Sequence, residues 1–137
     1  RSSAASDVYK RQAFGHDCVM DPWYSLGSGD MLEVAHMGLH VAQMTSQAGM
    51  RQCFDAVTVN AAKVMGLGGY GIVAGNDASF VLLQARDPVE AIRLRATRLK
   101  VWRKGRLLAQ TAPTEARLSL PGRPDSTAFM PARAGGG

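Results

Sequence analysis

The chain has 137 residues, of which 46% are hydrophobic and 20% charged, as in an ordinary soluble domain with a core. No apolar run approaches the roughly 20 residues that a membrane-spanning helix needs, because charged and histidine residues interrupt the stretch 31–44. The two cysteines, Cys18 and Cys53, are isolated and form no CxxC pair. This spacing excludes a zinc ribbon or disulfide scaffold and favours a reducing cytoplasm, so we expect a cytoplasmic protein without a membrane partner.

The net charge of +5 is unevenly placed, because eight of the sixteen basic residues lie between Arg86 and Arg106. Such a cluster can bind nucleic acid. However, aromatic residues do not alternate with these charges, as a stacking platform requires. We therefore interpret the cluster as a solvated helix face and edge-strand charges that discourage aggregation, and we expect no specific nucleic-acid partner.

Residues 1–12 are polar, have no clear period and end abruptly at an apolar segment. We interpret them as a non-native leader and leave them out of the fold. On this interpretation the natural chain begins further upstream, and these residues precede a C-terminal part of a longer protein.

The segment Ala13–Gly15 is short and apolar enough to end a buried strand. His16–Tyr24 follows, with three ionisable side chains, a thiol and two aromatic rings. Pro22 biases Asp21 away from the helical region, so this stretch predicts a strand end that runs into a loop. In an α/β protein, catalytic side chains are usually delivered at such a place.

A helix is predicted from about Ser28 or Asp30, either of which can cap it, to about Ser46. His36 and His40 are four residues apart and would share one helix face, which is metal-ligand spacing. The glutamate of an HExxH motif is absent, so we interpret them as partly buried histidines with satisfied hydrogen bonds.

A second helix is predicted from Arg51 to Val64, ended by Gly66. The glycines Gly66, Gly68 and Gly69 could suggest a phosphate loop. No Gly-Lys-Ser/Thr follows them and no GxGxxG opens a helix, so a plain turn is favoured.

From residue 72 onward the period changes to that of strands. Ser79–Leu83 predicts a buried strand, and Asp87–Arg95 a short helix that Asp87 caps. A hairpin follows around Lys104-Gly105, and its strands are Leu99–Arg103 and Arg106–Ala109.

The end of the chain is less regular. Glu115–Leu120 alternates as a further strand would, and Pro121–Gly137 has three prolines and ends in three glycines. We expect residues 121–137 to be disordered.

Three segments, in order, resemble the C-terminal end of bacterial cytosine deaminases of the amidohydrolase superfamily. They are Gly15-His16-Asp17 through Asp21-Pro22-Trp23-Tyr24 to His36-Met37-Gly38-Leu39-His40-Val41, Asn60-Ala61-Ala62-Lys63-Val64-Met65-Gly66-Leu67, and Gly71-Ile72-Val73-Ala74-Gly75-Asn76-Asp77-Ala78. The first is fairly specific to cytosine deaminases, and the other two are typical of the superfamily. Together they cover roughly residues 13–110.

The resemblance implies an α/β fold. Residues 13–68 would form the last strand and helices of a (β/α)8 metal-dependent hydrolase barrel. Residues 69–120 would form part of a small β-sandwich, a composite domain that also takes strands from the N-terminal part of the family's proteins. The parent protein is expected to form a homo-oligomer.

The resemblance also implies the site. Asp17 matches the metal-binding aspartate, which in the family also takes a proton from the metal-bound water. Trp23 matches an aromatic residue that shapes the pyrimidine pocket, whereas His16 matches a residue that is not a ligand. Cys18 stands where cytosine deaminases commonly carry a second aspartate facing the substrate. The cofactor would be one divalent metal ion, zinc or iron. Its other ligands lie outside this chain, which has three histidines and no His-x-His.

The implied function is hydrolytic deamination of a small nucleobase, cytosine, to uracil and ammonia, with this chain alone inactive. Because of Cys18, another aminopyrimidine, a purine or creatinine stays open as the substrate. Two hypotheses of other classes also stay open. One is a basic interaction module in which residues 93–106 bind nucleic acid or another acidic partner. The other is a stand-alone structural domain in which Asp17 is only a loop carboxylate.

Overall fold

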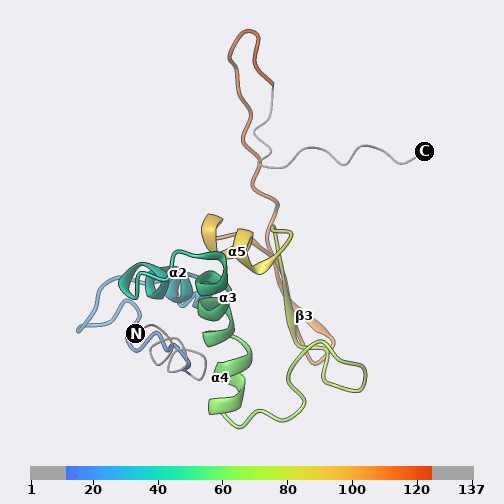
Figure 1. Ribbon diagram of the computed structural model, residues 1–137. Coiled ribbons are helices and arrows are strands. Elements are labelled where there is room, and N and C mark those ends of the chain that lie inside the picture. Colours follow the sequence, from blue (N-terminus) through green and yellow to red (C-terminus); the bar gives the residue numbers. More distant parts are fainter. Residues whose placement is uncertain (1–11, 125–137) are drawn as a thin grey trace.

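The computed structural model describes residues 12–124, which form a group of helices beside a small sheet (Figure 1). Of the expected leader, only Gln12 lies within the described residues. In chain order the elements are α2 Met31–Val41, α3 Gln47–Ala56, α4 Val59–Val64, β1 Phe80–Leu83, α5 Pro88–Leu94, β2 Arg98–Arg103 and β3 Arg106–Gln110. None of these helices is long and apolar enough to cross a membrane.

The core lies where α2, α3 and α5 pack together. Leu32, Ala35 and Leu39 are buried at the three- and four-residue spacing of one helix face, as predicted. The cluster of buried residues consists of Leu32, Ala35, Leu39, Cys53, Ala91, Ile92 and Ala96. Because α5 comes from the segment 69–120 yet packs against helices of 13–68, the helical layer draws on both predicted segments. The division into barrel and sandwich segments stays a prediction.

Two helices begin at aspartates: Asp30 is one of the two caps predicted for the first helix, and Asp87 is the cap predicted for α5. The Asp30 carboxylate accepts a hydrogen bond from the Leu32 N–H at 2.9 Å. The Asp87 carboxylate accepts from the N–H groups of Val89 and Glu90 at 2.8 and 2.9 Å. These bonds satisfy amides that have no partner inside the helix. The predicted helix Asp87–Arg95 is confirmed as α5.

The first helix ends earlier than the predicted Ser46. Gln43 adopts a left-handed backbone conformation, with φ of 52°, and the Met44 N–H donates to the Leu39 carbonyl at 2.9 Å. This arrangement closes the helix end as a Schellman motif. Ser46 instead caps α3, where its hydroxyl accepts from the Gly49 N–H at 3.0 Å.

The second predicted helix, Arg51–Val64, is two helices, α3 and α4, separated by Val57 and Thr58. The Thr58 hydroxyl donates to the Phe54 carbonyl at 2.8 Å, and its backbone is not helical. A hydroxyl that binds the carbonyl four residues earlier often bends or interrupts a helix. The predicted stop at Gly66 is confirmed, because its φ is +65° and it follows the end of α4.

The sheet is antiparallel, with strand order β1-β2-β3. The predicted hairpin is confirmed, because Lys104 and Gly105 both have positive φ, 50° and 76°. These angles are typical of the tight type I′ turn that matches strand twist. Phe80 lies opposite Trp102, with ring centroids 4.8 Å apart.

The expectation that β1 is buried is wrong for the described chain. Phe80, Val81 and Leu82 expose 38%, 46% and 47% of their surface. Successive side chains of a strand point to opposite faces, so both faces of β1 are open. Within residues 12–124 the sheet has no second layer on it, and from the strand only Leu83 packs against the helical core.

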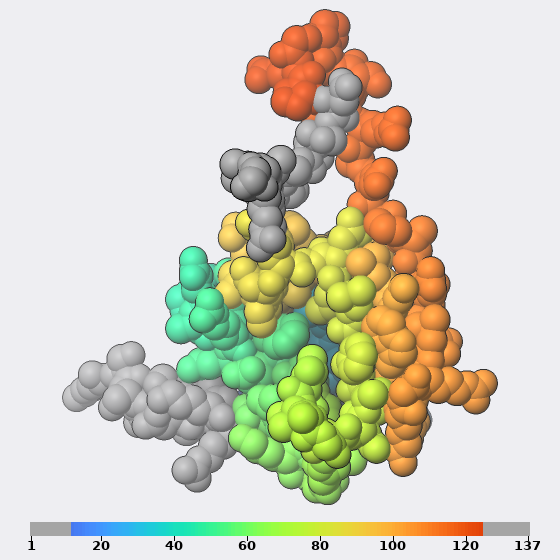
Figure 2. Space-filling model, turned by 90° about the vertical axis from the view of Figure 1, so that its right-hand side faces the viewer, coloured from blue at the N-terminus to red at the C-terminus, as the bar shows by residue number. Residues whose placement is uncertain are grey.

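Two further predicted strands do not form among the described residues. Ala13–Gly15 has no strand neighbour there, although the Phe14 N–H donates to the Ala56 carbonyl at 3.0 Å. Glu115–Leu120 holds one isolated bridge, at Arg117. Thr114 is still bonded to the sheet, because its N–H donates to the Gln84 side chain at 2.8 Å. After it, residues 115–124 extend away from the helices and the sheet (Figure 1 and Figure 2). A strand needs a neighbour along its length to pair its backbone groups. Among the described residues neither segment has such a neighbouring strand. Most of the tail expected to be disordered, from residue 125 on, lies outside the described residues.

Candidate active site

The segment of residues 13–18 is held against α2 by a close approach at a glycine. A Cβ atom built at Gly38 would lie 2.5 Å from the Phe14 ring, so only glycine lets this ring rest on the helix. At the other end of the segment, a Cβ atom built at Gly27 would lie 2.3 Å from His16 Cε1. Phe14 and His16 therefore anchor the segment to α2 and to the loop that precedes it.

The loop after this segment has an unusual backbone. Asp17 and Met20 both have positive φ, 63° and 46°, which non-glycine residues rarely adopt. The Met20 N–H donates to the Leu26 carbonyl, and the Asp21 N–H to the Tyr24 carbonyl, both at 3.0 Å. Left-handed non-glycine residues cluster at functional sites, where surrounding contacts impose them.

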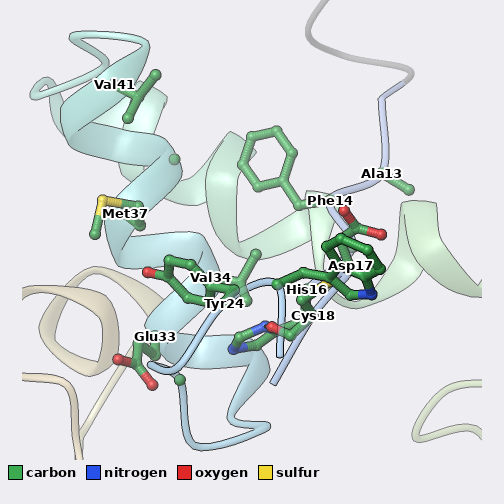
Figure 3. Close-up of a pocket in the computed structure, with 14 residues that line it drawn as sticks. Ala13, Phe14, His16, Asp17, Cys18, Tyr24, Glu33, Val34, Met37 and Val41 are labelled. Atoms are coloured by element: carbon green, nitrogen blue, oxygen red, sulfur yellow. The ribbon is translucent and has the colours of Figure 1, made fainter. Parts of the chain in front are cut away.

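All three site residues predicted from the sequence line one hollow of about 670 Å³. Asp17, Cys18 and Trp23 come from the segment and its loop, and α2 forms the facing wall (Figure 3). Asp17 lies on the opposite side of this hollow from Met37 and Val41 of α2. Trp23 is 88% exposed, so its ring is open to a ligand or to a covering segment. The structure thus brings the three residues together, and their roles stay predictions.

Asp21 organises the loop around the hollow. Its carboxylate accepts hydrogen bonds from the N–H groups of Trp23 and Tyr24 at 2.9 and 3.0 Å. Desolvation pushes the pKa of Asp21 upward, but bonds from the Cys18 thiol and from the backbone outweigh it and leave the pKa lowered. Asp21 therefore stays ionised and fixes the position of Trp23.

The Cys18 thiol is a neutral hydrogen-bond donor in this loop. Its bond to the Asp21 carboxylate raises the pKa of the thiol, and desolvation and the negative charge of Asp17 act in the same direction. At neutral pH a protonated thiol therefore lines the hollow, where the resemblance leads one to expect a carboxylate.

Two carboxylates line the hollow. Glu33, on α2, accepts a hydrogen bond from the Ser28 hydroxyl at 2.6 Å, and this bond lowers its pKa. Asp17 is exposed, and within residues 12–124 its carboxylate has no hydrogen bond or salt bridge. Asp17 is thus the carboxylate available to an incoming cation.

The described residues can supply one ligand to a metal ion, but they do not form a complete metal site. Nowhere in residues 12–124 do three or more histidine, cysteine, aspartate or glutamate side chains come together as a metal site requires. A catalytic zinc ion takes about three protein ligands. Asp17 can therefore supply one ligand to an ion whose other ligands come from elsewhere.

His36 and His40 lie away from this hollow, on the same face of α2 as predicted. Their rings meet edge to face, with centroids 4.7 Å apart. Partial burial lowers the pKa of His36, and the positive charges of His40 and Arg95 add to this effect. The interpretation of a partly buried histidine fits His36, whereas His40 is exposed.

The basic cluster is spread over α5 and the strands, and several of its members have acidic neighbours. Arg86 lies 3.5 Å from Glu90, and Arg98 lies 3.3 Å from Asp30. The absence of a specific nucleic-acid partner for this cluster stays a prediction. Exposed ion pairs of this kind contribute little to stability.

Sequence reasoning missed the local roles of His16, Asp21, Gly27 and Gly38. One signal was present for Asp21, because an aspartate before proline commonly accepts hydrogen bonds from amides two and three residues later. The close approaches at Gly27 and Gly38 depend on packing between distant segments, which no local pattern reveals.

Comparison with known proteins adds three relatives. Residues 10–109 match the model of the amidohydrolase family. The structure is similar to 5-methylcytosine deaminase from Klebsiella pneumoniae liganded with 5-fluorocytosine. The TM-score is 0.73 at 34% identity, and the match covers 79% of this chain and 26% of that one. It is also similar to N-isopropylammelide isopropylaminohydrolase from Burkholderia multivorans ATCC 17616. The TM-score is 0.64 at 32% identity, and the match covers 67% of this chain and 24% of that one.

A curated relative is likewise named as an amidohydrolase. N-isopropylammelide isopropyl amidohydrolase from Pseudomonas sp. (strain ADP) is 30% identical over 95 residues, which cover 69% of this chain and 24% of the relative. The chain thus spans about a quarter of the length of the relatives that it matches.

Proposed function

The chain belongs to the amidohydrolase family, and from this premise we propose that it is part of a metal-dependent deaminase that acts on cytosine or a closely related aminopyrimidine. In this proposal residues 13–68 complete a (β/α)8 barrel, and residues 69–120 contribute strands to a composite β-sandwich. The activity, the substrate and a homo-oligomeric assembly are proposed for the longer protein. The described residues alone do not hold a metal.

One observation carries the proposal: the Asp17 carboxylate, which has no bonded partner within residues 12–124, shares a hollow with Cys18 and Trp23. The hollow combines two carboxylates, Asp17 and Glu33, with apolar and aromatic walls, as sites for small heterocyclic ligands combine a few polar groups with apolar walls. The similarity to a deaminase liganded with 5-fluorocytosine, at 34% identity, supports the same class of ligand.

Each residue has a defined task in this proposal. A bound divalent ion, zinc or iron, would make a coordinated water acidic. Asp17 would be one ligand of that ion and would accept the water's proton. Overall, a bond would form from the water oxygen to the ring carbon that carries the exocyclic amine, and the bond from that carbon to the amine nitrogen would break. The amine takes up a proton and leaves as ammonia, so cytosine and water become uracil and ammonia.

Trp23 and Cys18 would shape the substrate pocket and not the chemistry. The Trp23 indole offers a flat apolar face for a heterocyclic ring. Cys18 offers a weak donor, and its interaction with Asp21 raises the pKa of the thiol. A thiol here binds a ring amine or N–H less strongly than a carboxylate would. We therefore propose that Cys18 influences which substrate is preferred.

The relatives favour a second candidate within the same family. Two of them are described by name as acting on N-isopropylammelide, at 30% and 32% identity. The longer protein would then release an alkylamine in place of ammonia. Other aminopyrimidines, purines and creatinine stay open as alternatives.

The test is a substrate panel on the longer protein rebuilt with its upstream segment. Cytosine, 5-methylcytosine, isocytosine, creatinine and N-isopropylammelide are compared by kcat/KM, and the released amine is identified. We expect ammonia from cytosine or another aminopyrimidine. Release of isopropylamine with no ammonia from any pyrimidine would replace the first candidate with the second.

A Cys18→Asp variant in the same panel tests the pocket. We expect metal content per chain to stay unchanged and the preference among the aminopyrimidines to change, because Cys18 lines the hollow without holding the ion. An unchanged preference would mean that Cys18 does not face the substrate.

A further inference from the structure

The backbone at the candidate metal ligand is held in a rarely populated conformation. Asp17 has φ of 63°, a region that crowds the Cβ atom of any residue except glycine. A conformation of this kind persists only where neighbouring groups impose it. The hydrogen bonds around Asp17 identify the group that does so.

His16 bridges this turn. Its Nδ1 lies 2.7 Å from the Cys18 carbonyl oxygen, so the bond spans Asp17. A carbonyl oxygen can only accept a hydrogen bond, so Nδ1 carries the proton. Gly27 approaches the other edge of the ring closely, because a Cβ atom there would lie 2.3 Å from Cε1 and 2.8 Å from Nε2.

The side chains of residues 13–18 point in two directions, toward α2 and its preceding loop or toward the opposite side of the hollow. Phe14 rests on Gly38 of α2, and His16 rests on Gly27 in the loop that leads to α2. Asp17 lies across the hollow from Met37 and Val41 of the same helix (Figure 3). His16 thus secures the segment on the helix side, while the carboxylate of its neighbour is presented to the other side.

We propose that His16 is a positioning residue: its Nδ1–H bond to the Cys18 carbonyl fixes the left-handed Asp17 and so aims the carboxylate at the ion. His16 itself binds no metal in this arrangement. The inference rests on the proposed function, in which Asp17 is a metal ligand. Groups that orient a metal ligand typically change metal affinity by about 10- to 100-fold when they are replaced.

Two amide substitutions distinguish the effect of the Nδ1–H donor of His16 from the effect of the size of its imidazole ring. In His16→Asn the side-chain amide can take the place of Nδ1 and still donate to Cys18. In His16→Gln the amide reaches toward the place of Nε2, and the donor to Cys18 is lost. Metal affinity of the longer protein is measured by competition with a chelator, and the melting midpoint of the metal-free form is measured beside it.

We expect His16→Asn to bind metal nearly as tightly as the parent and His16→Gln to bind it about 10- to 100-fold more weakly. The two metal-free variants should melt at similar temperatures, since both lose the ring that lies against Gly27 and they differ only by one methylene and one part-buried hydrogen bond. Equal losses in both variants, or full affinity in His16→Gln, would overturn the proposal.

A measurement without substitution separates this inference from the proposed function. Nitrogen NMR of the His16 ring in the metal-free longer protein should show the proton on Nδ1, and the Asp17 carbon shifts should indicate a left-handed residue. A proton on Nε2 would overturn the inference, whatever Asp17 binds. If Asp17→Asn keeps its metal while these signals are as expected, the metal role fails and the fixing of the turn stands.

Discussion

Asp21 illustrates how one side chain organises the candidate site. Its carboxylate fixes the amides of Trp23 and Tyr24 and accepts the Cys18 thiol hydrogen. The loop therefore depends on an ionised group that itself binds neither metal nor substrate in our proposal. Because the pKa of Asp21 is lowered, its contribution is complete above the ordinary value of 3.8 and is lost as pH falls through the lower folded value.

The coupling between Asp21 and Cys18 predicts the reactivity of the thiol. Alkylation of Cys18 should depend on pH with a midpoint above the ordinary 9.0, because the bond to Asp21 raises the pKa. Asp21→Asn removes the charge, so the midpoint should move toward 9.0. Mass spectrometry of the Cys18 peptide measures the rate, and buried Cys53 serves as an unreactive internal reference.

The matched control for this prediction is Asp55→Asn, which changes an exposed carboxylate on α3. It should leave the Cys18 profile unchanged. Superimposable profiles for the parent and Asp21→Asn would show that the thiol does not donate to this carboxylate.

The candidate site residues came from the family resemblance, and their roles stay predictions. Asp17, Cys18 and Trp23 were chosen from the sequence and line one hollow. The role of His16 was not predictable, because its hydrogen bond depends on the left-handed turn at Asp17 and on the space beside Gly27. Both are set by the conformation of the loop that runs from residue 16 to α2, which residue types alone do not determine.

The helices show the same division between local and tertiary control. Asp30 and Asp87 were predicted as caps, since capping depends on a side chain and amides two or three residues away. The end of α2 was misjudged by several residues, because Gln43 is a poor residue for the left-handed position that closes the helix. The break at Thr58 was missed because its hydroxyl competes for a helix carbonyl.

The left-handed Gln43 predicts a stabilising substitution. Gln43→Gly should raise the stability of α2 by on the order of 1 kcal/mol, because glycine adopts positive φ without strain. The same change at Gln52, inside α3, should lower stability by about 1 kcal/mol, because glycine weakens a helix interior. Loss of helical circular dichroism with urea measures both. Shifts in the same direction would contradict the assigned helix end.

Taken as a whole, the molecule leaves much apolar surface open. Both faces of β1 are exposed, and Leu107 and Leu108 of β3 expose 45% and 54%. Neighbouring residues of a strand face opposite sides, so β3 also lacks a cover on either face within residues 12–124. The period of these strands was predicted correctly, but the predicted burial of β1 was not. A strand pattern reports which side chains could be buried, and the covering layer must come from another segment.

This exposure predicts loose behaviour for the isolated chain. It should bind a hydrophobic dye and lose structure over a broad temperature range, because small cores and open apolar faces give weak cooperativity. Dye fluorescence and thermal circular dichroism measure both properties. A sharp cooperative melt of monomeric protein without dye binding would contradict the proposal that other segments complete this fold.

The basic cluster also belongs to the surface of the whole molecule. We expect residues 93–106 to contact duplex DNA no more tightly than other basic surfaces do, with Kd in the micromolar range or weaker at physiological salt. Fluorescence anisotropy at two salt concentrations measures this. Nanomolar, sequence-dependent binding would favour the interaction module over the enzyme.

The most direct test of the proposed function replaces Asp17 by asparagine in the longer protein. Asparagine keeps the size of the side chain but removes the charge that would hold the ion and the group that would accept the proton. Loss of a general base alone typically lowers the rate by about 10²- to 10⁴-fold, and weaker metal binding should add to this. Metal per chain and kcat/KM on cytosine are measured together. We predict that both fall, and near-parental turnover with full metal content would contradict the assignment of Asp17.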